Sequence, residues 1–271
     1  MPLKKDPSGR RSVQVEVEVP GTPEEVWQAI ATGPGVSAWF VPAEVEERDG
    51  KPVTIKTNFG PGMESIAHVT EWDPPRMFAA DSADLGPGAP TVATEWIIET
   101  RAGGRCLVRV VHSLFASNDD WDQQLEGWEQ GWPDFFRILR LYLTHFRGQS
   151  SSAFQLMAMA PEPRSVAWNT LSGALGLSDA RESQRFRASS GAPTLAGQVE
   201  FVGAEPYPEQ LLLRLDQPTP GVAHLFAMSM EGQVVVSIRL YLYGDRAAKA
   251  VAHEQPRWQA WLREHFPPAP N

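Results

Sequence analysis

Apolar and polar residues alternate along residues 13–19, VQVEVEV, so the valines occupy one face of the segment and the polar residues the other. This period of two is typical of a β-strand with one buried face. Pro20 and Gly21 end the strand. Thr22, followed three residues later by Glu25, then predicts a capping box and the start of a helix.

Residues 42–115 contain short strand-like segments separated by Gly, Pro and Asp turn signals. This spacing predicts an antiparallel meander. Residues 117–120 (Ser117 to Asp120) then supply a cap and an acidic first turn, and the apolar residues after them have helical spacing. We therefore predict that a long helix closes the unit, with a break or a fresh start at residues 131–133.

The pattern begins again after a small polar linker at residues 148–152. Residues 154–168 repeat the pattern of residues 13–27 without a gap. Two later segments, at residues 69–78 and 141–146, resemble residues 202–211 and 260–266 in the same order but at shorter sequence separations. Echoes in a conserved order indicate a duplicated unit. We predict two domains, at residues 12–147 and 153–266, with the second shortened.

The phrases EVWQAI, AWFVP, TEWDPPRMF and GWPDFFRILRLYL follow one another in the first copy. Together they resemble the SRPBCC (START/Bet v 1-like) superfamily, in its branch similar to the C-terminal domain of the activator of Hsp90 ATPase. The resemblance covers residues 12–147 well and residues 153–266 weakly. It implies an α+β fold with two helix-grip units, in each of which a curved antiparallel sheet wraps around a long C-terminal helix.

The same resemblance implies a cavity between sheet and helix that holds an apolar or amphipathic small molecule, either lipid-like or polyketide-like. The aromatic surplus fits such a cavity, because the chain has ten tryptophans and ligand pockets are mostly apolar. For each ring, the alternative that it only fills a core stays open. The predicted ligand-binding residues are Trp39, Phe40, Trp72, Trp96, His112, Phe115, Trp128, Trp132, Phe136, Leu139 and Leu143.

His112 is the strongest polar candidate. In RCLVRVVHS it shares a face with Cys106, Val108 and Val110, and this small apolar set is typical of the concave side of a sheet. His112 could orient a ligand carbonyl or act as a general base near neutral pH. A hydrogen-bonded structural histidine is the alternative.

The sequence gives little support for a metal, cofactor, nucleic-acid or membrane function. The histidines and the single Cys106 have no metal-ligand spacing, and no nucleophile elbow or phosphate loop is present, so we predict no metal and no cofactor. The net charge of −9 with dispersed basic residues disfavours nucleic acid. No apolar stretch reaches the roughly 18 residues of a membrane span. The expected location is cytoplasmic.

The leading hypothesis is therefore a non-catalytic protein that binds an apolar small molecule in its first domain. A cyclase or aromatase with His112 as the base is the enzymatic alternative. A chaperone-linked interaction protein is the third.

The second copy differs from the first on one face of its opening strand. Met157 and Met159 stand where the first copy has Glu16 and Glu18. An apolar outer face normally marks a contact surface. We expect this face to form a homodimer or a tight contact between the domains.

Overall fold

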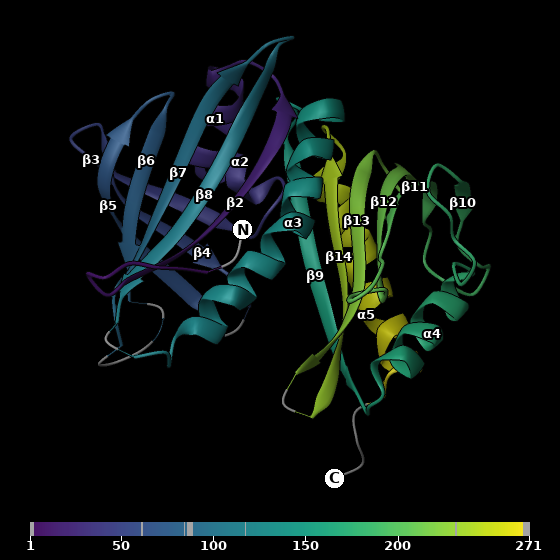
Figure 1. Cartoon of the computed structure of the whole chain (residues 1–271). Coiled ribbons are helices and arrows are strands. Elements are labelled where there is room, and N and C mark those ends of the chain that lie inside the picture. The colour runs from purple at the N-terminus through teal and green to yellow at the C-terminus, as the bar shows by residue number, and fades with distance from the viewer. Residues whose placement is uncertain are drawn as a thin grey trace. The chain divides into compact units, whose positions relative to one another are not determined.

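The computed structural model describes residues 3–60, 62–83, 85, 89–116, 118–230 and 232–267. The chain forms two compact units that divide between Arg147 and Gly148 (Figure 1). Each unit combines one antiparallel sheet with helices. This is the α+β class expected from the sequence, with two helix-grip units, and that expectation is confirmed.

The first unit contains an eight-stranded sheet with the order β1-β2-β8-β7-β6-β5-β4-β3. Every neighbouring pair is antiparallel. The strands from β3 to β8 form the meander that the turn signals predict. The strand bounds are Lys4–Lys5 (β1), Arg10–Pro20 (β2), Ala43–Arg48 (β3), Lys51–Asn58 (β4), Glu64–Asp73 (β5), Met77–Ser82 (β6), Val92–Arg101 (β7) and Arg105–Phe115 (β8).

Two short helices, α1 (Pro23–Ala31) and α2 (Gly33–Ser37), follow β2. Thr22 caps α1 with the predicted capping box, because its hydroxyl accepts from the Glu25 amide and its own amide donates to the Glu25 carboxylate. The indole of Trp39 donates to the carbonyl of Ala29 at 2.9 Å and so ties the end of α2 to α1.

The long helix α3 (Asp122–His145) closes the first unit and packs against β2. The predicted break at residues 131–133 was wrong, because α3 continues through Pro133. Trp132 and Phe136 are both buried, and their packing holds the helix together across the missing proline N–H. Ser117, which was expected to cap this helix, lies outside the described residues.

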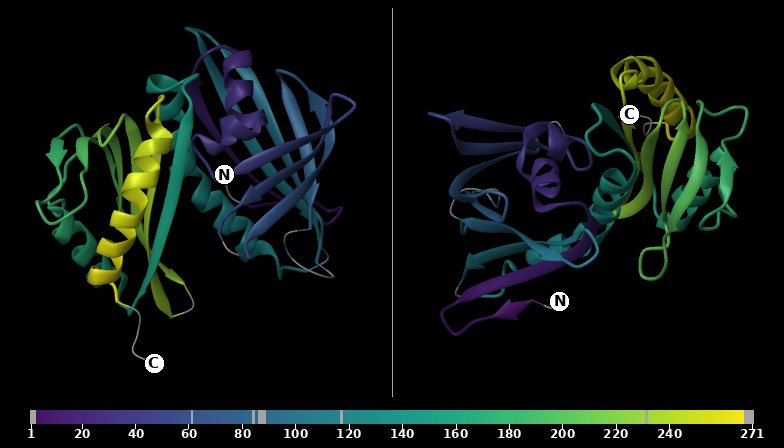
Figure 2. Two further views of the ribbon diagram at one scale, coloured as in Figure 1. Left: turned by 180° about the vertical axis from the view of Figure 1, so that it is seen from behind. Right: turned by 90° about the horizontal axis from the view of Figure 1, so that it is seen from above.

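The second unit has a six-stranded sheet with the order β10-β11-β12-β13-β14-β9. Helix α4 packs against β13 and β14, and α5 packs against β9 and β14 (Figure 2). The bounds are Ser151–Ala160 (β9), Arg164–Leu175 (α4), Arg185–Arg187 (β10), Ala196–Val202 (β11), Gln210–Gln217 (β12), Gly221–Met230 (β13), Gln233–Tyr243 (β14) and Ala247–His265 (α5). Strand β9 already begins inside the segment expected to be a linker.

The two sheets can be compared strand by strand. Strand β9 corresponds to β2, and both lie beside the last strand of their unit, β14 and β8. Working outward from there, β13, β12, β11 and β10 take the places of β7, β6, β5 and β4. Within the described residues, the second sheet has no counterpart of β1 or β3, which accounts for part of the shortening.

Candidate functional site

Aromatic side chains from three parts of the first unit meet on the concave side of its sheet. Trp96 comes from β7 and Trp132 from α3, and their ring centroids lie 5.1 Å apart. Phe40, just after α2, stacks on Trp132 at 5.2 Å and contacts Phe135 at 4.4 Å. Phe136 packs against both Trp96 and Trp132. We call Phe40, Trp96, Trp132, Phe135 and Phe136 the aromatic cluster.

The aromatic cluster runs from the interior to the surface. On its inner side Trp96 stacks on Phe78, which is 3% exposed. On its outer side Phe40 contacts Phe59 at 5.6 Å, and Phe59 is 40% exposed. A continuous path of rings therefore leads from the core to solvent.

Small apolar residues extend the concave side beyond the aromatic cluster. Ile55 on β4 faces Ala67 on β5, and Val69 follows two residues later on the same face. All three are only partly buried, although they point to the side of the sheet that carries His112. Partly exposed apolar residues beside exposed rings are a suitable surface for an apolar ligand.

His112 lies on β8 at the edge of the aromatic cluster, and both of its ring nitrogens are engaged. The indole Nε1 of Trp132 can only donate, so His112 Nε2 accepts this bond, at 2.7 Å. The proton of the neutral ring therefore lies on Nδ1, which donates to the Thr94 hydroxyl at 2.9 Å. Burial lowers the pKa of His112 to about 4.

Ion pairs connect the start of α3 to the strands β1 and β2. Arg11 on β2 pairs with Asp122 at 2.5 Å and with Asp119 at 2.6 Å, and Lys5 on β1 contacts the same two carboxylates. Hydrogen bonds from Arg11 and Lys5 lower the pKa of Asp119 below its usual value. These acids anchor the helix that carries Trp128 and Trp132.

The structure brings six of the predicted site residues together. Trp128 lies 5.1 Å from His112, ring to ring, and His112 in turn stacks on Trp132, which contacts Phe40, Trp96 and Phe136. Trp39 adjoins this group, because its ring centroid lies 6.3 Å from that of Trp96 and 5.6 Å from that of Phe40. Trp39, Leu139 and Leu143 are at most 1% exposed, and Trp72 packs on Trp27 beside α1.

Phe115 corrects the predicted set. It is 65% exposed and does not join the aromatic cluster. Side chains alternate along a strand, so a residue three positions after His112 points to the opposite face of β8.

Three rings of the site were missed from the sequence: Phe59, Phe78 and Phe135. Phe135 follows Trp132 at helical spacing, so the periodicity of α3 contains the signal for it. Phe59 follows the strand β4, and no pattern in its neighbourhood distinguishes it from an ordinary turn residue.

In the described part of the chain, no three His, Cys, Asp or Glu side chains are grouped so that they could hold a metal ion. None of the helices there combines the length and the apolar character needed to cross a bilayer.

The first unit is thus a helix-grip domain whose concave side is rich in aromatic residues. Residues 20–144 match the family described as activator of Hsp90 ATPase homolog 1-like protein. The matched range lies within the first unit, and for this unit the resemblance stated from the sequence is confirmed.

Functionally curated proteins gave no match. Among solved structures, CalU16 from Micromonospora echinospora is 19% identical, with a TM-score of 0.41, covering 53% of this chain and 83% of its own. DynU16, from the dynemicin biosynthetic locus, is 19% identical, with a TM-score of 0.40 and coverage of 94% and 93%. The Aha1 dimer from Colwellia psychrerythraea is 20% identical, with a TM-score of 0.38 and coverage of 49% and 95%. Sequence identities and TM-scores this low do not allow the function of these proteins to be assigned to this chain.

Proposed function

We propose that the first unit binds an apolar or amphipathic small molecule at the aromatic cluster. The observation that carries this proposal is the continuous path of rings from buried Trp96 to exposed Phe59, beside the partly exposed apolar residues of β4 and β5. A ligand entering at Phe59 would exchange contact with water for contact with Phe40 and Phe135. A flat or branched apolar molecule suits such ring faces best.

His112 supports binding rather than catalysis. A general base must have a lone pair that is free to accept the substrate's proton. In this structure the accepting nitrogen of His112 is occupied by Trp132, and a pKa of about 4 leaves the ring a weak base at neutral pH. The cyclase alternative therefore has no favourable observation at His112. The chaperone-linked alternative rests on the name of the matching family alone.

Native mass spectrometry of the purified protein tests directly for a retained small molecule. A titration with the apolar fluorescent probe anilinonaphthalene sulfonate then tests the location. Phe40→Ala should weaken probe binding about tenfold, since burying one aromatic side chain contributes about 1.5 to 3 kcal/mol and part of its surface is already covered.

Phe115→Ala is the matched control, because it removes an exposed ring from the other face of the same sheet. Its probe affinity should equal that of the parent. Equal affinity of Phe40→Ala and the parent, or equal losses in both variants, would refute binding at the aromatic cluster.

A further inference from the structure

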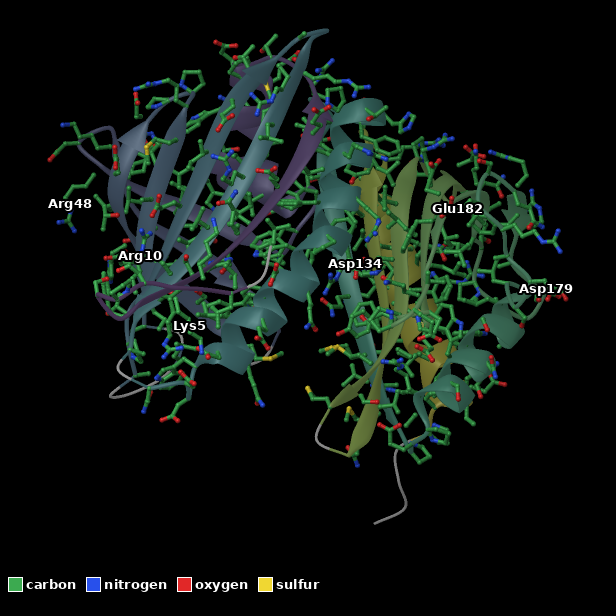
Figure 3. All side chains as sticks on the ribbon, viewed as in Figure 1. Lys5, Arg10, Arg48, Asp134, Asp179 and Glu182 are labelled. Atoms are coloured by element: carbon green, nitrogen blue, oxygen red, sulfur yellow. The ribbon has the colours of Figure 1, made fainter. Side chains whose placement is uncertain are left out.

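Four methionines gather on one face of the second sheet, the face opposite its core. Met157 and Met159 lie on β9, and Met228 and Met230 lie on β13. Each is 45–47% exposed. Several sulfur atoms, in yellow, lie beside the ends of these strands in Figure 3. We call these four residues the methionine face.

Adjacent residues on these two strands, and Val234 on the strand β14 between them, point the other way. Leu156 and Ala158 of β9 pack on the apolar core of the second unit, as do Ala227 of β13 and Val234 of β14. Strand β9 is the last strand in the sheet order, so among the residues described for this unit no further strand lies beyond Met157 and Met159.

The corresponding face of the first sheet is ionic. Arg109 pairs with Glu16 at 3.2 Å and with Glu99 at 2.9 Å. Arg105 pairs with Glu18 at 3.3 Å, and a further pair joins Arg101 to Glu99 at 2.8 Å. Six charged side chains on three adjacent strands therefore cover this face.

The strand registers show what replaced each charge. In the first sheet Glu18 faces Leu107, and Leu107 faces Glu99. In the second sheet Met159 faces Val235, and Val235 faces Met228 in the same way. Carrying this register through, the positions of Glu16, Glu18, Glu99, Arg101, Arg105 and Arg109 are held by Met157, Met159, Met228, Met230, Gln233 and Ser237.

At these six positions the second copy therefore has four methionines and no charge. Depletion of charge and enrichment in methionine are the composition of the core of a protein interface, and the flexible thioether fills irregular gaps. A face exposed only to water would not need these substitutions, because ion pairs such as those of the first sheet are compatible with solvent.

The charge pattern indicates the partner. The chain carries a net charge of −9, so two copies repel each other over most of their surface. The four methionines and their neighbours Val235 and Gln233 carry no charge, and Arg239, on the same side of β14, is only 9% exposed. This exposed area is therefore self-complementary, as a two-fold contact requires. We propose that the methionine face joins two copies of this protein in a homodimer.

The size of the face sets the strength of the contact. Three strands about 4.8 Å apart and three rows about 6.8 Å apart cover roughly 300 Å². A stable interface buries roughly 800 Å² on each partner. The methionine face therefore supplies the centre of a weak dimer whose population depends on protein concentration.

Sedimentation equilibrium of the full chain tests this proposal, from about 10 to about 500 µM, where contacts of this limited area associate. The mass of the parent should rise with concentration toward that of a dimer. Met157→Glu combined with Met159→Glu should remain monomeric throughout. Val166→Glu is the control, since Val166 is 56% exposed on α4, and it should associate as the parent does.

A second variant guards against misfolding. It combines Met159→Glu, Gln233→Arg, Met228→Glu and Met230→Arg, which gives the second sheet the residues that form the Arg105–Glu18 and Arg101–Glu99 pairs of the first. Two acids and two bases are added, so the net charge of the chain is unchanged. This variant should fold, as judged by circular dichroism, and should be monomeric.

A monomeric parent over the whole range, or a folded variant that associates as the parent does, would overturn the proposal. Limited proteolysis near Ser150 separates one further outcome. If the variants keep the parent's mass but are cut faster there, the face contacts the first unit and the homodimer is refuted.

Discussion

Acidification should destabilise the first unit through His112. Burial lowers the pKa of His112 to about 4 in the folded chain, from the value of 6.5 that an unperturbed imidazole has. Between these two values the unfolded state binds more protons than the folded state, so the free energy of unfolding rises with pH. The contribution is fully present above about pH 6.5 and is lost as the pH falls toward about 4.

The magnitude follows from the two pKa values. Each pH unit between them is worth about 1.4 kcal/mol, so the full window amounts to about 3 kcal/mol. About 2 kcal/mol of this is lost between about pH 7 and pH 5.

Urea unfolding of the parent and of His112→Gln at both pH values measures this loss. Glutamine does not titrate in this range, and its carbonyl can still accept the hydrogen bond from Trp132. All other groups titrate in both proteins, so the parent should lose about 2 kcal/mol more than the variant on acidification. His68→Gln, at an exposed position on β5, should behave as the parent does. Equal losses in the parent and in His112→Gln would show that the folded chain does not hold His112 in its neutral form.

Two further substitutions test the packing around the site. Leu139→Ala should lower the free energy of unfolding by about 2 to 5 kcal/mol in urea, because Leu139 is 0% exposed, and an unchanged value would place it beside open space. Trp39→Phe should cost about 1 to 3 kcal/mol, because it leaves the carbonyl of Ala29 without its indole donor. Hydrogen exchange should then be faster in α1, and exchange equal to that of the parent would contradict the role of this bond.

Alternation and turn signals predicted the sheets because they act locally. The valines of β2 face inward, as their spacing indicates, with Val13 and Val19 at most 2% exposed. His112 falls on the concave face for the same reason. The error at Phe115 arose from choosing an aromatic residue near His112 without applying the alternation that had placed His112.

The aromatic contacts were expected from the family resemblance, because alternation and turn signals do not specify them. Trp132 meets Trp96 and His112 only because α3 lies over the sheet in one particular register, and the sequence contains no local signal for that register. The predicted break at Pro133 failed for a related reason. A proline weakens a helix locally, but the burial of Trp132 and Phe136 depends on residues distant in the sequence.

The strand correspondence also explains why the proposed ligand site belongs to one unit and the proposed contact face to the other. His112 faces Thr94 in the first sheet, and Leu240 faces Ala223 at the same place in the second. Leu240 and Ala223 are both 0% exposed, so aliphatic packing fills the position where the first unit has its hydrogen-bonded histidine.

Both faces of the second sheet are thus less polar than the corresponding faces of the first. Its inner face has leucine and alanine where the first unit has a hydrogen-bonded polar pair, so aliphatic packing takes the place of two polar groups there. Its outer face has exchanged ion pairs for methionines, which removes the charges that keep a surface in water. Both changes favour apolar contact, the inner one within the unit and the outer one with a partner. The loss of the polar pair on the inner face fits a unit without the proposed ligand site. The loss of the ion pairs on the outer face fits a surface that is covered by a partner.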